Sequence, residues 1–150
     1  MALFKFTKAM LEGKPIEIYN NGKMKRDFTY IDDLVQSIIR LVKALPPSID
    51  NRQKHLVNDS LSDVAPWRVV NIGNSRPVNL MDYVKALEEA LNIKSKRNMT
   101  EMQAGDVTET WADTKLLNSL TKFQPETNVG DGIKKFVRWY RDYYGVTADK

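Results

Sequence analysis

Helical and strand-like patterns alternate along this chain, and that alternation limits its possible folds more than any other feature. Helical spacing of apolar residues predicts helices at 2–12, from Asp32 or Asp33 to Leu45, from Asn79 to Leu91, from Asp113 to Lys122 and at 129–144. Short strand patterns lie between them, at 16–19, 26–30, 67–73 and 94–102. Helices interleaved with short strands over 150 residues predict one α/β domain spanning residues 1–150.

The second of these helices has the widest apolar stripe, and we expect it to be the clearest core helix. Its stripe consists of Leu34, Val35, Ile38, Ile39, Leu41, Val42 and Leu45, and Pro46-Pro47 ends it. Residues 46–66, which carry Pro, Ser, Asn and Asp, predict a long surface loop. The only histidine, His55, lies there, where a solvated side chain is a better interpretation than a general base.

Composition excludes several classes of protein. The chain is 42% hydrophobic and 28% charged, so it can bury a core, and no apolar run reaches the ~18 residues of a membrane span. Its first residues lack the layout of a secretory signal. The absence of cysteine and the single histidine exclude disulfides, thiolate metal sites and histidine-rich metal sites. We therefore predict a soluble, cytoplasmic protein with no bound metal.

The net charge of +4 raises the question of nucleic-acid binding. Its 23 basic residues are interleaved with 19 acidic ones, and the short basic run Lys23–Arg26 is followed at once by Asp27. This distribution argues against a nucleic-acid surface, whose binding would depend steeply on salt. A local site for an anion such as a diphosphate needs only a few basic groups.

Two segments carry candidate binding residues. Arg26 lies at the mouth of a predicted strand, where its planar guanidinium can fork onto a phosphate, although on composition alone a solvated arginine beside a helix cap is the better interpretation. In Gln103-Ala104-Gly105-Asp106-Val107, the glycine permits close backbone approach and Asp106 can accept hydrogen bonds from sugar hydroxyls. Taken alone, this segment is better interpreted as a turn before the helix that Asp113 caps.

Familiar catalytic motifs are missing. The seven glycines are dispersed, so there is no glycine fingerprint for a dinucleotide, and there is no P-loop, Gly-x-Ser-x-Gly or His-Glu-x-x-His. Tyr19 and Lys23 have the Tyr-x-x-x-Lys spacing of short-chain dehydrogenases. That chemistry needs both residues on one helical face, and Asn20-Asn21-Gly22 between them favours a turn.

Taken in order, several blocks resemble the C-terminal part of the extended short-chain dehydrogenase/reductase family, the NAD-dependent sugar-nucleotide epimerases and dehydratases. The blocks most resemble the UDP-glucuronate 4-epimerase group and cover nearly the whole chain except 46–66. They are Met1–Phe6, Gly13–Ile16, Gly22–Asp33, Trp67–Val69, Asn71–Ser75, Gln103–Val107, Ala112–Thr114 and Phe136–Tyr140.

The resemblance implies a substrate-binding role for specific residues. Arg26 would contact the UDP diphosphate, Ile18 and Tyr19 would lie along the uracil, and Asp106 would reach the ribose or phosphate side. Many relatives have an arginine where this chain has Gln103, so a phosphate role at that position is weaker. The apolar start near Ala2 and Leu3 would lie close to the sugar.

The resemblance also implies which part of the family's reaction this chain cannot perform. In the family, NAD oxidises C4 of the sugar and returns hydride to the other face, whereas this chain lacks the glycine fingerprint and the helical Tyr-x-x-x-Lys of the Rossmann half. We therefore expect the UDP-sugar-binding half of a UDP-glucuronate 4-epimerase-like enzyme, inactive alone and binding no NAD itself. Its ligand would be UDP-glucuronate or UDP-galacturonate. The alternatives are the same half of an NDP-sugar dehydratase and a non-enzymatic assembly module that forms homo-oligomers through an open strand edge at 68–72.

Overall fold

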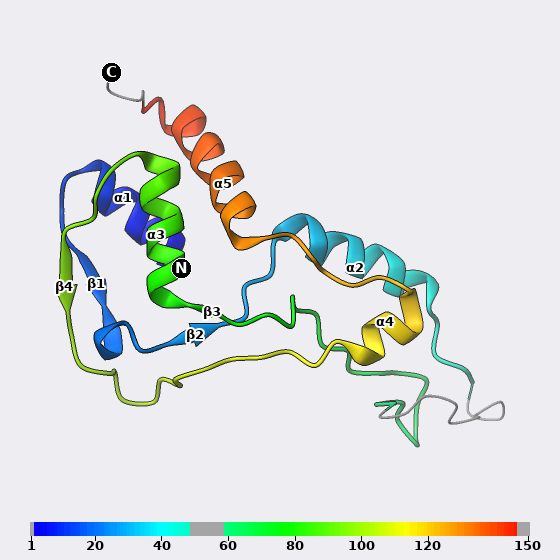
Figure 1. The fold of residues 1–150 in the computed structure, drawn as a ribbon. Coiled ribbons are helices and arrows are strands. Elements are labelled where there is room, and N and C mark those ends of the chain that lie inside the picture. The colour runs from blue at the N-terminus through cyan, green and yellow to red at the C-terminus, as the bar shows by residue number, and fades with distance from the viewer. Residues whose placement is uncertain (1, 49–58, 147–150) are drawn as a thin grey trace. The chain divides into compact units, whose positions relative to one another are not determined.

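The computed structural model describes residues 2–48 and 59–146, which fall into two compact units, each built from separated stretches of chain (Figure 1). Unit 1 comprises the described parts of Met1–Arg26, Pro77–Thr110 and Asn128–Lys150, and unit 2 those of Asp27–Arg76 and Trp111–Thr127. Unit 1 contains α1 (Ala2–Leu11), β1 (Ile16–Ile18), the 3-10 turn η1 (Tyr19–Gly22), β2 (Lys25–Arg26), β3 (Val78–Asn79), α3 (Leu80–Leu91), β4 (Arg97–Met99) and α5 (Val129–Tyr144). Unit 2 contains α2 (Ile31–Lys43) and α4 (Lys115–Thr121).

Two short sheets organise unit 1. β1 pairs in parallel with β4, with Ile16 opposite Arg97 and Ile18 opposite Met99, and β2 pairs antiparallel with β3. The Ile-Glu-Ile sequence of β1 alternates as a half-buried strand should, since Ile16 and Ile18 are buried and the glutamate between them is exposed. β1 and β4 lie side by side at one edge of the unit in Figure 1.

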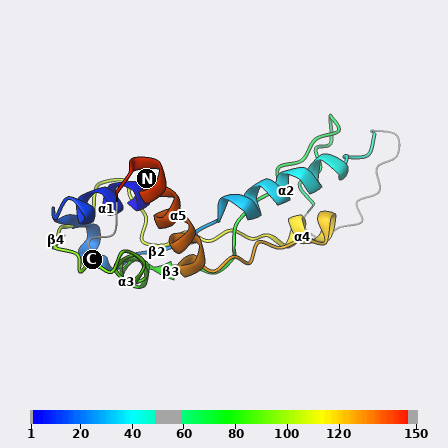
Figure 2. The same ribbon diagram turned by 90° about the horizontal axis from the view of Figure 1, so that it is seen from above.

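Helices α3 and α5 lie next to each other, as Figures 1 and 2 both show, and their side chains supply most of the core of unit 1. Their buried side chains are Tyr83, Val84, Leu87 and Leu91 on α3 and Ile133, Val137 and Tyr140 on α5. At the C-terminal end of α3, the Arg141 guanidinium donates to the Leu91 carbonyl at 2.9 Å. Phe4 of α1 meets the Phe136 ring edge to face, with 5.0 Å between centroids.

The sequence predicted most ends of these helices. Asn79, expected at the start of its helix, is the N-cap of α3, and the N-cap of α5 is Asn128, whose side chain accepts from the backbone N–H of Gly130. Gly13 follows α1 with φ +67, the left-handed conformation that glycine adopts at little cost. The α-helices of unit 1 are therefore confirmed almost to the residue.

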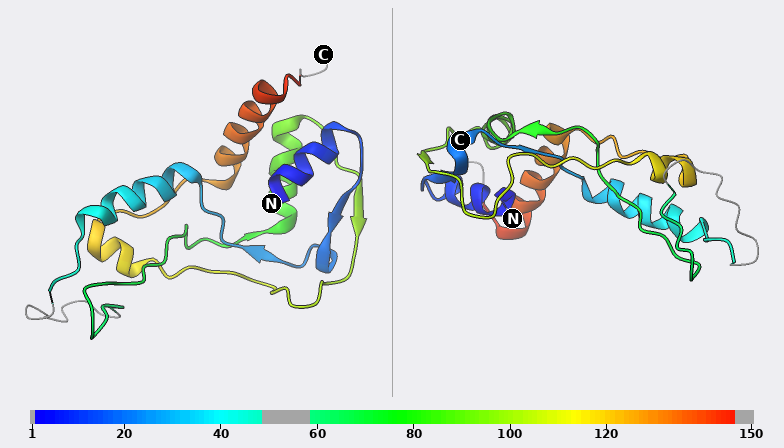
Figure 3. Two further views of the ribbon diagram at one scale, coloured as in Figure 1. Left: turned by 180° about the vertical axis from the view of Figure 1, so that it is seen from behind. Right: turned by 90° about the horizontal axis from the view of Figure 1, so that it is seen from below.

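Unit 2 corrects the expectation for the widest apolar stripe. α2 forms where predicted and packs against α4, as the two views of Figure 3 show, but its only fully buried side chain is Ser37. Most of the stripe is exposed: Leu34 and Leu41 are half-buried, and the exposed residues are Val35, Ile38, Ile39, Val42 and Leu45. The N-cap is Tyr30, and Asp32 and Asp33 lie in the first turn, where the carboxylates face the positive end of the helix dipole.

Two strand predictions differ from the structure. Residues 67–72 contain no strand, because no neighbouring strand pairs with them among the described residues, and β2 ends at Arg26 whereas the sequence suggested 26–30. The described parts of the predicted loop, 46–48 and 59–66, contain neither helix nor strand. The rest of that loop, including His55, lies outside the described residues. No helix in the described part of the chain is long and apolar enough to cross a membrane.

Candidate functional site

Arg26 is the last residue of β2, and backbone contacts hold this strand on both sides. β3 pairs with β2 on one side, and on the other the Lys25 amide donates to Thr108 O at 2.8 Å while Thr110 N donates to Lys25 O at 3.2 Å. This second contact brings in a segment of chain some eighty residues away. The Arg26 side chain is 25% exposed, so a ligand in solution can reach it.

Arg26 contacts Asp106 directly. Its Nη2 lies 2.8 Å from Asp106 Oδ1, and its Nη1 donates to the carbonyl of Lys25 at 2.9 Å. The same Asp106 oxygen accepts from the backbone N–H of Val107 at 2.9 Å, and the Asp106 side chain is 34% exposed. The two residues that the sequence singled out from separate segments therefore form one half-exposed ion pair.

A tight turn holds the carboxylate of this pair. Asp106 N donates to Gln103 O at 3.2 Å, and Gly105 has φ +82, a backbone conformation that most residues avoid. A Cβ on Gly105 would meet nothing within 4 Å, so the glycine is needed for backbone conformation and not for space. The Gln103 side chain is exposed on the same turn.

The predicted uracil residues differ in accessibility. The Ile18 side chain is fully buried and its carbonyl accepts from Thr100 N at 2.9 Å, whereas Tyr19 is half-buried in η1. Asn21 N donates to Thr100 O, which ties η1 to the chain that leads into the turn at Gln103. Tyr19 is thus the member of this pair whose side chain a ligand can contact.

The structure does not place Tyr19 and Lys23 on one face of an α-helix. Asn20 and Asn21 have φ near +50, and Lys23 lies beyond the end of η1, so no α-helix carries both side chains on one face. Gly22 at the end of this turn lies close to Met81: a Cβ added to Gly22 would lie 2.7 Å from Met81 Sδ. The segment is a chain reversal between β1 and β2.

Two features, one in each unit, were not predicted individually. The Lys25 ammonium lies 4.0 Å from a carboxylate oxygen of Glu109, which places a second ion pair at the same crossing of chains. In unit 2, Asp27 accepts backbone N–H bonds from Asn74, Ser75 and Ala112 at 3.0–3.1 Å. The only sequence feature that pointed to Asp27 was the matched Arg-Asp-Phe block. Such a block does not reveal which backbone amides a carboxylate will bind.

The Arg26–Asp106 arrangement suits recognition of a phosphorylated sugar better than proton transfer. A guanidinium carries five N–H donors, and the bonds described above occupy two of them. Asp106 Oδ2 is left to accept from hydroxyl groups, and the described residues contain no cluster of His, Cys, Asp and Glu suited to a metal ion. Ala2 is exposed and Leu3 half-buried at the start of α1, and no described contact joins them to this pair.

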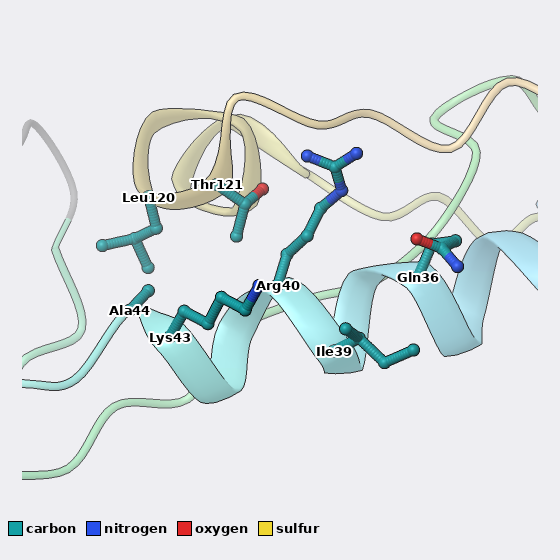
Figure 4. A pocket seen from close by; sticks show the side chains of 7 residues that line it. All are labelled: Gln36, Ile39, Arg40, Lys43, Ala44, Leu120 and Thr121. Atoms are coloured by element: carbon teal, nitrogen blue, oxygen red, sulfur yellow. The ribbon is translucent and has the colours of Figure 1, made fainter.

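A hollow of about 420 Å³ lies between α2 and α4 within unit 2 (Figure 4). Arg40 reaches from α2 toward Thr121, and its guanidinium also lies 4.8 Å from the centre of the Phe123 ring. The lining residues are Gln36, Ile39, Arg40, Lys43, Ala44, Leu120 and Thr121. None of the predicted site residues is among them.

Comparisons with known proteins agree with these blocks. Residues 1–57 match the model of the NAD dependent epimerase/dehydratase family. An uncharacterized 37.6 kDa protein of Escherichia coli O111:H- is 59% identical to this chain, and the match covers 97% of this chain and 43% of the relative. A probable UDP-glucuronate 4-epimerase of Rhizobium meliloti is 50% identical, and the match covers 96% of this chain and 42% of the relative. The solved UDP-glucuronic acid 4-epimerase of Bacillus cereus, in complex with UDP-glucuronic acid and NAD, is 26% identical with a TM-score of 0.75, over 96% of this chain and 40% of that one.

The matches confirm the resemblance and the mixed α/β fold class. The matches also show how much of each relative corresponds to this chain, which spans about two fifths of their length.

Proposed function

Given its relationship to the NAD-dependent epimerase/dehydratase family, we propose that this chain binds the UDP moiety of a uronic acid nucleotide as the substrate-binding portion of a UDP-glucuronate 4-epimerase-like enzyme. The ion pair between Arg26 and Asp106 carries the proposal. It joins a phosphate-binding type of side chain to a hydroxyl-binding one at 2.8 Å, and both are partly exposed.

The free donors of Arg26 would bind the diphosphate. Charge-assisted bonds from a guanidinium to phosphate oxygens are short and strong, and Asp106 already holds the guanidinium in place, so little side-chain freedom is lost on binding. A phosphate at Arg26 also replaces part of the charge compensation that Asp106 provides. Asp106 is then free to turn its carboxylate toward the ribose hydroxyls.

Tyr19 and Gln103 would complete the nucleotide site. The half-exposed ring of Tyr19 offers a surface for the uracil, and Gln103 offers an amide on the turn that carries Asp106. Ile18 would be a positioning residue. Its buried side chain and its hydrogen-bonded carbonyl hold the start of the turn that carries Tyr19.

The residues that the structure describes do not fit NAD. None of the glycines forms a phosphate loop between a strand and a helix: Gly73 packs against Ala112, for example, and Gly130 lies inside α5. We therefore propose that the chain takes no part in hydride transfer and has no epimerase activity alone. In this role it binds and orients the nucleotide.

Titration calorimetry with UDP, UDP-glucuronate and UDP-galacturonate tests the proposal. We expect Arg26→Ala to weaken binding of all three by about tenfold or more, as the loss of a charged hydrogen bond predicts. Lys25→Ala is the matched control: it removes a neighbouring positive charge from the same strand and should change affinity by less than about threefold. Equal losses in the two variants would mean that binding follows general charge, and the phosphate role of Arg26 would be rejected.

Asp106→Asn separates the two halves of the site. If Asp106 accepts from the ribose, the variant should lose affinity for UDP while inorganic pyrophosphate, which has no ribose, binds as well or better once the carboxylate charge is gone. A parallel change for both ligands would contradict a ribose role for Asp106.

A further inference from the structure

We propose that the hollow between α2 and α4 is a binding site for a small organic phosphate, separate from the residues assigned to the UDP moiety. All of the residues that line the hollow belong to unit 2, whereas Arg26 and Asp106 belong to unit 1. The proposal therefore goes beyond nucleotide binding and does not rest on it.

Two basic side chains on one face of α2 supply the charge of this site. Arg40 and Lys43 lie one helical turn apart, and Gln36 lies one turn before Arg40, so all three line the hollow from the same helix. In the part of the chain that the structure describes, no ion pair or hydrogen bond engages the side chain of Arg40 or Lys43. No acidic residue is among the described residues that line the hollow. Both positive charges are therefore available to a ligand.

The helix ends beside the hollow do not cancel this charge. Arg40 and Lys43 lie in the last turn of α2, and the last turn of α4 forms the opposite wall. The C-terminal end of a helix carries about half a negative charge, so two such ends offset about one of the two positive charges. The carboxylates of α2 itself, Asp32 and Asp33, are in its first turn, about 10 Å or more from Arg40 along the helix axis. A net positive charge remains, and it favours an anion.

Arg40 is held in place before any ligand binds. Its guanidinium lies 4.8 Å from the centre of the Phe123 ring, a contact that engages its charge but none of its N–H donors. The Phe123 backbone N–H donates to Thr121 Oγ1 at 3.2 Å, and that hydroxyl donates to Leu117 O at 2.7 Å, so the ring is tied to α4. Figure 4 shows Arg40 extending from α2 toward Thr121. A ligand would therefore find the guanidinium already ordered, which lowers the entropic cost of binding.

The size and the remaining lining indicate the kind of anion. A volume of about 420 Å³ is in the range of small-molecule sites, and Ile39, Ala44 and Leu120 give the hollow an apolar part. A guanidinium can donate two parallel bonds to one phosphate, and an ammonium binds phosphate as a point charge. A phosphate monoester carries about 1.5 to 2 negative charges at neutral pH, close to the charge of Arg40 and Lys43 together. A phosphate ester with a small apolar group matches both parts of the hollow.

Calorimetry with phenyl phosphate as the probe tests the proposal, with inorganic phosphate and phenol as comparison ligands. The titrated protein is the Arg26→Ala variant, so that the residue proposed to bind the diphosphate does not contribute. We expect phenyl phosphate to bind more tightly than inorganic phosphate, because only the ester also contacts the apolar part, and phenol to show no measurable binding. Shifts of the backbone amide NMR signals of Lys43, Leu120 and Thr121 should locate the ligand in the hollow.

Two substitutions in the same background identify the groups that bind. Lys43→Ala leaves the contact between Arg40 and Phe123 intact and should weaken phenyl phosphate binding by about fivefold or more. Arg40→Lys keeps the charge but removes the planar fork, and should weaken binding by about threefold or more. Lys115→Ala is the matched control: it removes a lysine from the first position of α4, outside the hollow, and should bind within about twofold of the background protein.

Three results would overturn the proposal. They are the absence of phenyl phosphate binding to the Arg26→Ala chain, equal losses for Lys43→Ala and Lys115→Ala, and NMR shifts confined to residues outside unit 2. If inorganic phosphate binds as tightly as the ester, the site takes free phosphate and the assignment to an organic phosphate is wrong. The UDP titrations use the unmodified chain and its Arg26 variant with other ligands, so a failure of UDP binding and a failure at this hollow are separate results.

Discussion

Replacing Glu88 by glutamine should destabilise unit 1 in a way that depends on pH. The Glu88 side chain is 4% exposed, and its carboxylate accepts from the Ser95 amide and hydroxyl, from Arg97 Nη2 at 2.8 Å and from Lys94 Nζ at 3.3 Å. These bonds tie α3 to the chain that enters β4. The glutamine keeps the shape of the side chain but removes the charge.

The magnitude follows from the pKa of Glu88. Burial by itself would raise this pKa, but the hydrogen bonds from Ser95, Arg97 and Lys94 outweigh burial and lower it from an ordinary 4.5 to about 2. At about 1.4 kcal/mol per unit, a shift of this size corresponds to about 3 kcal/mol of stability. Most of this comes from Ser95 and Arg97, because Lys94 is 88% exposed and its attraction is screened by water.

The lowered pKa of Glu88 sets the direction in which stability changes with pH. A carboxyl that is more acidic in the folded state stabilises it fully above the unfolded pKa, and the contribution is lost as pH falls from about 4.5 to about 2. We therefore expect Glu88→Gln to lower the free energy of unfolding by about 3 kcal/mol at pH 7. The difference from the unmodified chain should shrink toward zero near pH 2.

Urea unfolding at several pH values measures this difference. Trp139 lies on α5 of unit 1, whereas Trp67 and Trp111 lie in unit 2, so replacing the latter two by phenylalanine makes fluorescence report on unit 1. Glu89→Gln is the matched control, an exposed glutamate next along the same helix, and should cost less than about 0.5 kcal/mol. A Glu88→Gln effect that stays constant with pH, or that equals the effect of Glu89→Gln, would refute the reasoning.

Two further stability predictions follow from close contacts. A Cβ on Gly73 would overlap the Ala112 Cβ, so Gly73→Ala should destabilise unit 2 by about 1–3 kcal/mol in urea unfolding, and adding Ala112→Gly should restore part of the loss. If the double variant is no more stable than Gly73→Ala, that contact is not the cause. Asn128→Ala removes the side chain that caps α5 and should cost about 1 kcal/mol, whereas Asn128→Ser should keep most of the stability. Equal losses for the two substitutions would show that the cap does not matter.

Local pattern predicted the helices of unit 1 well because their apolar spacing and their caps agree. Of the four residues expected to face inward in α5, Ile133, Val137 and Tyr140 are buried and Phe136 is half-buried, and the helix runs from Val129 to Tyr144 as its pattern indicated. The candidate site was predicted in part: Arg26 and Asp106 stood out as separate residues, each with a simple structural alternative. Their contact could not be derived from local spacing, since eighty residues separate them.

The sequence by itself determined where this chain forms helices and turns, because periodicity, caps and left-handed positions act over a few residues. Only the tertiary structure decided which apolar faces are covered and which polar groups meet. The stripe of α2 has the pattern of a core helix yet lies exposed, and 67–72 has the composition of a strand yet pairs with none in the described residues. Burial and strand pairing depend on what lies opposite, and no local pattern carries that information.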